Sequence, residues 1–252
     1  MSQQIEYLKQ AELALAAYAD FTSDMLTQAE LEDADFSTSQ ARTFTDTYRL
    51  VAQYTDATGL SATIFTDKVS GEAFLAIRGT EASDSMDLLT DLIDITWLGS
   101  TTLQPQYISL KFKVAEWLEN GILPQNFTVT GHSLGGFLAA GLVAEPMFTN
   151  HISHAYLFNT PGVGGYTGPS AAAYAILDFL GVAPAYDQSK ISNIEAATDI
   201  SPISGLGFDV APPIDAIIED QMVWDISDPS SMRNHSQQVL IDASVVYSVV
   251  FA

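Results

Sequence analysis

Short apolar runs alternate with amphipathic stretches over most of the chain after residue 60. Two β-rich runs, Ser61 to Thr66 and Glu72 to Ile77, flank the turn sequence Asp67-Lys68-Val69-Ser70-Gly71 and predict a hairpin. Further strands are predicted at 127–130, 154–158 and 191–196, and helices at 106–120, from 134 to about 144, and from about Gln237 onward. This alternation predicts an α/β fold, in which helices cover the faces of a sheet.

The first 55 residues have the pattern of a helical extension ahead of the sheet. One helix is expected to present a single apolar face, formed by Ile5, Leu8, Leu15 and Tyr18. A second helix is expected to begin at a cap supplied by Ser37, Thr38 or Ser39 and to carry Phe44, Tyr48 and Val51. In the helix over 106–120, the side chains expected to face the core are Ile108, Phe112, Ala115 and Leu118, with Gly121 ending the helix.

The composition is that of a folded globular protein, with 47% hydrophobic and 16% charged residues among 252. No internal repeat and no linker rich in Pro, Gly and Ser divides the chain. We therefore expect one domain over residues 1–252.

The charge balance excludes some partners. Nine Lys and Arg residues stand against 31 Asp and Glu residues, which gives a formal net charge of −22. Nucleic acid is not an expected partner, because too few cations are present to neutralise phosphates, and an anionic membrane surface would be repelled. Cysteine is absent, so disulfides, thiolate metal sites and a cysteine nucleophile are excluded.

The N-terminus lacks the basic start and apolar stretch of a signal peptide, and no apolar run approaches the roughly 18 residues of a transmembrane helix. We expect a soluble protein without a transmembrane segment. It would be either cytoplasmic or exported by a route that reads no N-terminal signal.

Ser133 is the strongest candidate for chemistry. It is central in the Gly-x-Ser-x-Gly motif of residues 131–135, between a predicted strand and a predicted helix, which is the context of a nucleophile elbow. Side chains at Gly131 and Gly135 would collide with neighbouring backbone in so tight a turn. The helix behind the serine directs its amide groups at developing negative charge, which suits a tetrahedral oxyanion. The alternative is a glycine-rich bend that only links a strand to a helix.

A serine nucleophile needs a base and an acid, and in this context the chain order is Ser, acid, His. His151 and His154 flank the strand directly after the nucleophile helix, ahead of any downstream acid, so His235 is the predicted base. Asp199 is the favoured acid, because it follows the strand beginning at Ile191, at the sheet edge that presents Ser133. The other acids between Ser133 and His235 are Glu145, Asp178, Asp187, Glu195, Asp209, Asp215, Glu219, Asp220, Asp225 and Asp228.

Two backbone amides are candidates for an oxyanion hole. Thr80 follows the strand that ends at Ile77, and Leu134 follows the nucleophile. The pair His151 and His154 has no third ligand nearby in sequence, so no metal site is predicted, and the chemistry requires no cofactor.

These motifs, taken together and in this order, resemble the class 3 lipase family of α/β-hydrolases over about residues 60–250. The resembling stretches are Ala76-Ile77-Arg78-Gly79-Thr80, Asp87-Leu88-Leu89-Thr90-Asp91-Leu92, Thr130-Gly131-His132-Ser133-Leu134-Gly135-Gly136, Asn159-Thr160-Pro161, Asp199-Ile200-Ser201-Pro202 and His235. The family commonly has Val where Ile200-Ser201 precedes Pro202, and the first 55 residues match poorly.

The resemblance implies an α/β-hydrolase fold, with a mostly parallel central sheet, helices on both faces and an N-terminal helical extension. It implies a lipase or esterase in which Ser133 is the nucleophile, Asp199 the orienting acid, His235 the general base, and Thr80 and Leu134 the oxyanion donors. The substrate would be a lipid or other ester, and a lipid–water interface is a candidate partner. The end of the chain also looks like lipase domains of large secreted proteins with calcium-binding glycine-rich repeats, which implies an extracellular location.

Two apolar segments have a functional and a structural interpretation. Residues 81–104 mix apolar side chains with aspartates and resemble a lid helix, or else form an ordinary amphipathic core helix. Residues 200–224 could line an acyl pocket or be packing. The leading hypothesis is a triacylglycerol lipase or esterase. A phospholipase A1 and a catalytically silent binding module on a hydrolase scaffold are the alternatives.

Overall fold

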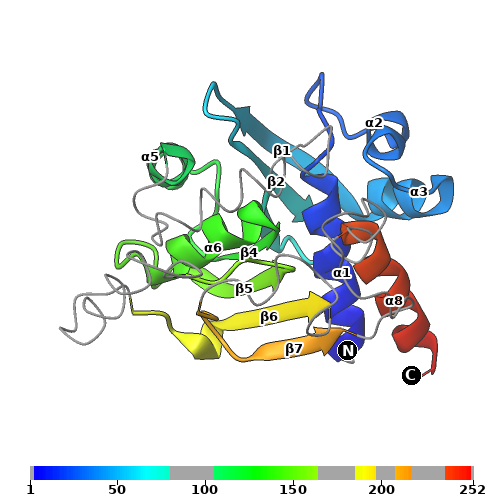
Figure 1. Cartoon of the computed structure of the whole chain (residues 1–252). Coiled ribbons are helices and arrows are strands. Elements are labelled where there is room, and N and C mark those ends of the chain that lie inside the picture. The colour runs from blue at the N-terminus through cyan, green and yellow to red at the C-terminus, as the bar shows by residue number, and fades with distance from the viewer. Residues whose placement is uncertain (1–2, 80–104, 164–184, 197–207, 217–235, 251–252) are drawn as a thin grey trace.

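The computed structural model describes residues 3–79, 105–163, 185–196, 208–216 and 236–250 (Figure 1). A seven-stranded sheet runs through these ranges, with its strands in the order β1 to β7. β1, β2 and β3 are antiparallel neighbours, and the strands from β3 to β7 are parallel. The strands are β1 (Tyr48–Thr55), β2 (Ser61–Asp67), β3 (Ala73–Ile77), β4 (Phe127–His132), β5 (Ile152–Phe158), β6 (Ile191–Ala196) and β7 (Pro213–Ala216).

Helices cover both faces of the sheet. Successive side chains of a strand point to opposite faces, so each central strand contributes to a core on either side. On β3, Leu75 and Ile77 join a core formed with α5 and α6, whereas Phe74 and Ala76 join a second core formed with α1, α3 and α8. α1 and α8 lie side by side in Figure 1 and contact each other. The helices are α1 (Gln3–Ala16), α2 (Gln28–Asp33), α3 (Thr38–Thr47), α5 (Pro105–Glu119), α6 (Leu134–Ala144) and α8 (Gln237–Val250), with the 3-10 turn η2 at Gln188–Lys190.

Most of the predicted elements are confirmed within one to three residues. The hairpin is β2 and β3, and the three later strands are β4, β5 and β6. The cap of α3 is Ser37, whose hydroxyl accepts from the backbone of Gln40 while the Gln40 side chain accepts from the backbone of Ser37. Gly121 takes a positive φ of 68° just after α5, as its role in ending that helix requires.

The expected continuation of a helix through Tyr48 and Val51 is wrong. α3 ends at Thr47, and Tyr48 is already extended at φ −110° and ψ 158°. From there the chain pairs with β2 as the antiparallel strand β1, and Tyr48 lies opposite Asp67. The rings of Tyr48 and Phe44 still pack together, with their centroids 4.6 Å apart. The helical spacing of these two residues therefore reflects a contact between a helix and a strand.

The expected buried face of α5 is also wrong. Tyr107, Leu110, Val114 and Trp117 are buried, whereas Ile108 is 45% exposed and Phe112 is 71% exposed. Both sets follow helical spacing, so the periodicity of this helix does not identify its inner face. Ala115 and Leu118 are partly buried at the margin of the core, as expected for them. On α1, Ile5 is 39% exposed although it was expected on the apolar face.

β7 was not predicted. Its four residues pair in parallel with β6, and Pro213, opposite Asn193, begins the strand at the edge of the described sheet, where a missing amide donor is tolerated. None of the helices in the described ranges has the length and apolar content required to cross a bilayer.

Candidate active site

The chain makes a sharp turn at Ser133, between the end of β4 and the start of α6. Ser133 has φ 56° and ψ −126°, a conformation that L-residues rarely adopt. Its amide donates to the carbonyl of Phe158 on β5 at 2.9 Å, and its carbonyl accepts from Phe137 at 3.2 Å. The turn is therefore fixed from both sides by backbone hydrogen bonds.

The glycines of the motif are required by close backbone contact. A Cβ on Gly131 would overlap the carbonyl group of Gly135, and a Cβ on Gly135 would overlap the carbonyl of Ile77 at the end of β3. These overlaps are with backbone, which cannot rotate away. Sheet, helices on both faces and this strand-turn-helix elbow together form an α/β-hydrolase fold, which confirms the fold class expected from the sequence.

The environment of Ser133 suits a nucleophile. The residue is 1% exposed, and its Oγ has no hydrogen-bond partner in the part of the chain that the structure describes. Leu134 is the first residue of α6, where an amide has no intrahelical carbonyl to bond and the helix dipole is positive. The Leu134 amide is therefore a hydrogen-bond donor without an intrahelical acceptor, directly beside Ser133 in the chain.

The other predicted site residues, Thr80, Asp199 and His235, lie outside the described residues, and so does the expected lid, residues 81–104. The elements that lead to them are described. β3, β4 and β6 run parallel in one sheet, so their carboxyl ends share one edge. The segments that carry Thr80 and Asp199 therefore begin at the edge where Ser133 lies.

Several buried polar residues near this edge make contacts that the sequence analysis did not predict. Asn159, directly after β5, has a positive φ of 45° and is fully buried. Its backbone amide donates to the carbonyl of Ile194 at 2.9 Å. His132, which precedes Ser133, is hydrogen-bonded through Nδ1 to the Tyr18 hydroxyl at 2.9 Å. Glu195 on β6 is 6% exposed and accepts from the Asn193 side chain at 2.5 Å. Their roles depend on tertiary contacts, for which the sequence carries no local signal.

The side chains of His151 and His154 form hydrogen bonds within the fold. His151 Nδ1 is bonded to the carbonyl of Gln125 at 2.8 Å, and His154 Nε2 to the Ser192 hydroxyl at 2.9 Å. Burial lowers the pKa of His154. Within the described ranges, no three His, Cys, Asp or Glu side chains are grouped as metal ligands would be.

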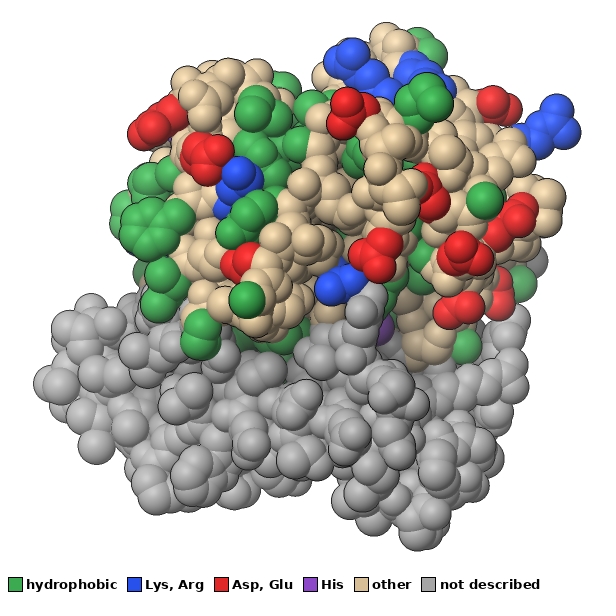
Figure 2. Space-filling model, turned by 90° about the horizontal axis from the view of Figure 1, so that it is seen from above, with side chains coloured by type: hydrophobic (Ala, Val, Ile, Leu, Met, Phe, Trp, Pro, Cys, Tyr) green, Lys and Arg blue, Asp and Glu red, His purple; other side chains and the backbone are tan. Residues whose placement is uncertain are grey.

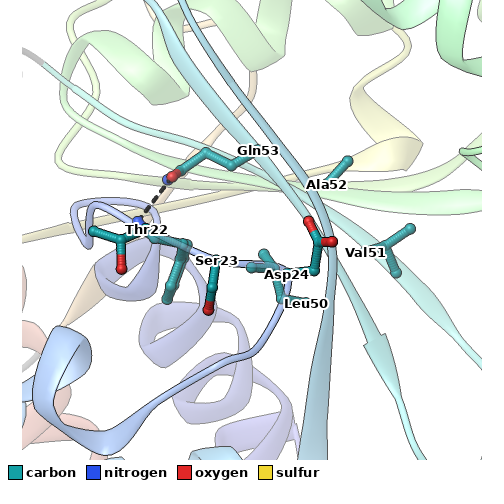
Figure 3. A pocket seen from close by; sticks show the side chains of 8 residues that line it. Thr22, Ser23, Asp24, Leu50, Val51, Ala52 and Gln53 are labelled. Atoms are coloured by element: carbon teal, nitrogen blue, oxygen red, sulfur yellow. Dashed lines mark hydrogen bonds between the residues drawn. The ribbon is translucent and has the colours of Figure 1, made fainter.

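A shallow pocket of about 170 Å³ lies away from the elbow (Figure 3). It is formed by Phe21, Thr22, Ser23 and Asp24 against residues 50–53 of β1. The Gln53 side chain accepts from the Phe21 amide at 3.0 Å and closes one end. None of the lining residues belongs to the nucleophile turn.

Solved structures that resemble this chain include lipases. Lip2 lipase from Yarrowia lipolytica is 20% identical, with 79% of this chain aligned to 73% of that one and a TM-score of 0.45. A fungal lipase in an inhibitor complex is 18% identical, over 81% of this chain and 76% of that one, with a TM-score of 0.48. The Rhizomucor miehei lipase propeptide complex is 12% identical, over 95% and 82%, with a TM-score of 0.43. No family model matches the chain, and no curated protein matches it significantly. Similarity at this level does not transfer an activity.

Proposed function

We propose that the protein is a serine ester hydrolase of the class 3 lipase type, with Ser133 as its nucleophile. The observation that carries the proposal is the geometry of Ser133: a serine held at positive φ, between a parallel strand and the first residue of an apolar helix. A bend that only linked a strand to a helix would not require a serine in a strained conformation, where glycine is more stable.

The proposed reaction is acyl transfer. His235 removes the Ser133 proton, the alkoxide attacks the ester carbonyl, and the amides of Leu134 and Thr80 stabilise the oxyanion. Asp199 orients the imidazole and stabilises its charged form. The alcohol leaves with a proton from His235, and water then hydrolyses the acyl-enzyme by the same steps. No cofactor takes part.

The proposed substrates are carboxylic esters of lipids, with triacylglycerol favoured and a phospholipid head group as the alternative. Residues 81–104 are the proposed lid over the site, which would make activity depend on a lipid–water interface. The ratio of turnover on a triglyceride emulsion to turnover on phospholipid micelles distinguishes a lipase from a phospholipase A1.

The test is hydrolysis of p-nitrophenyl esters from butyrate to palmitate by the wild type, Ser133→Ala and Ser61→Ala. Ser61 is a matched control, because it is also a fully buried serine whose Oγ has no partner among the described residues. Ser133→Ala should lose at least about 10³-fold in kcat, as expected for removal of a nucleophile, while Ser61→Ala retains activity. Near wild-type turnover by folded Ser133→Ala would refute the proposal. A wild type without any turnover would favour the binding module.

A further inference from the structure

Tyr18 contacts the nucleophile turn from the N-terminal extension. Its hydroxyl and His132 Nδ1 are joined by a hydrogen bond of 2.9 Å, and the two rings are tilted with centroids 6.0 Å apart. His132 is the last residue of β4, is 6% exposed, and directly precedes Ser133. The hydrogen bond therefore fixes a side chain one residue from the nucleophile.

The same hydroxyl also lies close to Gly79, two residues after the end of β3. A Cβ on Gly79 would lie 2.5 Å from the Tyr18 hydroxyl, 2.7 Å from the His132 carbonyl and 3.1 Å from Ser133 Cβ. Gly79 is thus closely surrounded on the side where a Cβ would lie. The three groups there are the Tyr18 hydroxyl, the His132 carbonyl and the Ser133 side chain. Gly79 is the residue before Thr80, the proposed oxyanion donor.

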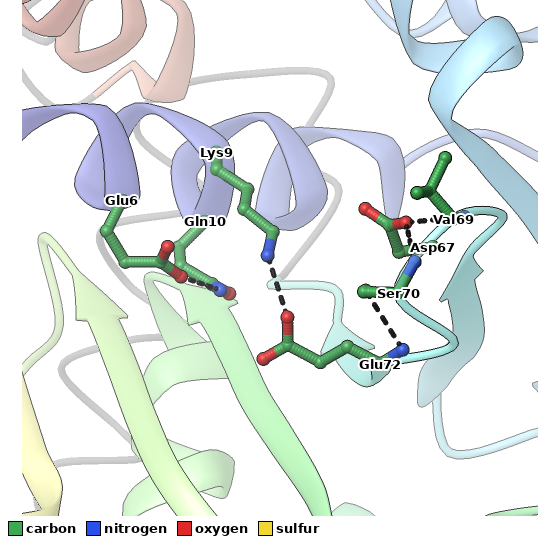
Figure 4. A network of polar contacts seen from close by, with 7 residues as sticks. All are labelled: Glu6, Lys9, Gln10, Asp67, Val69, Ser70 and Glu72. Atoms are coloured by element: carbon green, nitrogen blue, oxygen red, sulfur yellow. Dashed lines mark hydrogen bonds and ion pairs between the residues drawn. The ribbon is translucent and has the colours of Figure 1, made fainter. Parts of the chain in front are cut away.

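The position of Tyr18 is itself fixed. Its amide donates to Leu15 at 2.9 Å at the end of α1, and Gln53 on β1 donates to the Ala19 carbonyl at 2.8 Å. α1 is anchored to the sheet by Thr130, whose hydroxyl donates to the Gln10 carbonyl at 3.0 Å. Figure 4 shows a further anchor, the ion pair of 2.9 Å between Lys9 on α1 and Glu72.

The contacts of α1 with β4 follow the alternation of the strand. Thr130 and His132 are two residues apart, so they point to the same face of the sheet, and both are bonded to α1 or to the turn after it. A packed helix thereby holds the strand that delivers the nucleophile. Displacements of about 1 Å in a reacting group can cost about 100-fold in rate, so a contact that fixes this strand end matters for turnover.

We infer that Tyr18 is a positioning residue for Ser133, supplied by the N-terminal extension of the chain. The inference rests on the proposed function of Ser133. Loss of the hydroxyl removes one partner from a buried imidazole and leaves open space beside Gly79, so the turn can shift toward β3. The chemical step is affected and the ester-binding residues are not.

The experiment measures kcat, KM and the rate of inactivation by a fluorophosphonate for wild type, Tyr18→Phe and Tyr7→Phe. Tyr7 is the matched control, a tyrosine on α1 itself: its ring contacts Tyr156, and its hydroxyl accepts from Gln3 at an exposed site. Tyr18→Phe should lower kcat and the inactivation rate about tenfold with KM within about twofold, at unchanged circular dichroism. Tyr7→Phe should stay within about twofold on all three.

A double variant tests whether Tyr18 acts through His132. In a His132→Ala background, Tyr18→Phe should cause a smaller loss than it does in the wild type, because the hydrogen bond is already absent and only the packing beside Gly79 is left to lose. An additive loss, or a Tyr18→Phe variant with wild-type kcat, would overturn the positioning role while leaving the hydrolase proposal intact. A folded wild type that neither hydrolyses esters nor reacts with the fluorophosphonate would overturn both.

Discussion

At the residue scale, Ser133 stores backbone strain that its neighbours impose. Its φ of 56° and ψ of −126° lie where a Cβ is disfavoured, and strain of this kind costs roughly 1–3 kcal/mol. The hydrogen bond to Phe158 and the close approach of Gly135 to β3 hold the turn in place. A nucleophile at this position is therefore a cost to stability.

Replacing Ser133 by glycine should relieve this strain. Ser133→Gly is expected to have a free energy of unfolding about 1 kcal/mol higher than Ser133→Ala, measured by urea denaturation, because glycine adopts positive φ without a Cβ penalty. At Ser61, the first residue of β2, the order should reverse, since glycine weakens a strand. Equal stability of the two Ser133 variants would show that the turn is not strained.

Glu12 on α1 gives the stability a pH dependence. Burial raises the pKa of its carboxyl group from 4.5 to about 7. The folded state therefore binds this proton more tightly than the unfolded state. The contribution of Glu12 to the free energy of unfolding is favourable at low pH and is lost as the pH rises from about 4.5 to 7. Glu12→Gln should be more stable than wild type at pH 8, by at most roughly 3 kcal/mol, and nearly equal at pH 4.

The measurement is chemical denaturation of wild type, Glu12→Gln and Glu32→Gln between pH 4 and 8. Glu32 is an exposed carboxylate on α2 and serves as the control for the substitution itself. A Glu12→Gln curve parallel to that of the wild type over this range would contradict the assignment.

Sequence reasoning identified Ser133 because its signal is local: two glycines and a strand-helix boundary are visible within a few residues. Tyr18 and His132 are 114 residues apart, and their contact exists only because α1 packs on the face of β4 that carries Thr130 and His132. No periodicity or spacing in the chain encodes that pairing. The structure bears out the strand-turn-helix elbow at Ser133, whereas the catalytic roles of Ser133, Leu134, Asp199, His235 and Thr80 remain predictions.

At the element scale, the described strands and helices from 61 onward, apart from β7, were predictable because the apolar runs and turn residues agree with one another. β1 was not, because Phe44 and Tyr48 have helical spacing and contact each other across the end of α3. The inner face of α5 was ambiguous, because the helix carries two apolar stripes and only packing against α6 and the sheet selects one.

The two stripes of α5 should respond differently to truncation. Leu110→Ala is expected to lower the free energy of unfolding by about 2–5 kcal/mol, because it opens a cavity in a fully buried site. Phe112→Ala, at a side chain 71% exposed, should change it by no more than about 0.5 kcal/mol. Urea denaturation of the two variants measures both. A larger loss at Phe112 than at Leu110 would mean that the helix presents the opposite face to the core.

At the scale of the whole molecule, charge repulsion opposes the compact state. The net charge is −22, and Figure 2 shows acidic side chains spread over the visible face with fewer basic ones. The melting temperature should therefore rise by a few degrees between about 0.01 M and 0.5 M NaCl, as screening shortens the range of repulsion. Near the sequence pI of 4.1 the rise should vanish. A melting temperature independent of salt at pH 8 would contradict this.

The most direct test of the proposed chemistry is to locate the residue that a fluorophosphonate modifies. Wild-type protein and Ser133→Ala are treated with the probe, digested, and analysed by peptide mass spectrometry. A nucleophile activated at the turn predicts one adduct, on Ser133, that is lost in Ser133→Ala and kept in Ser61→Ala. An adduct on another serine, or a folded wild type that forms none, would contradict the assignment of Ser133 as the nucleophile.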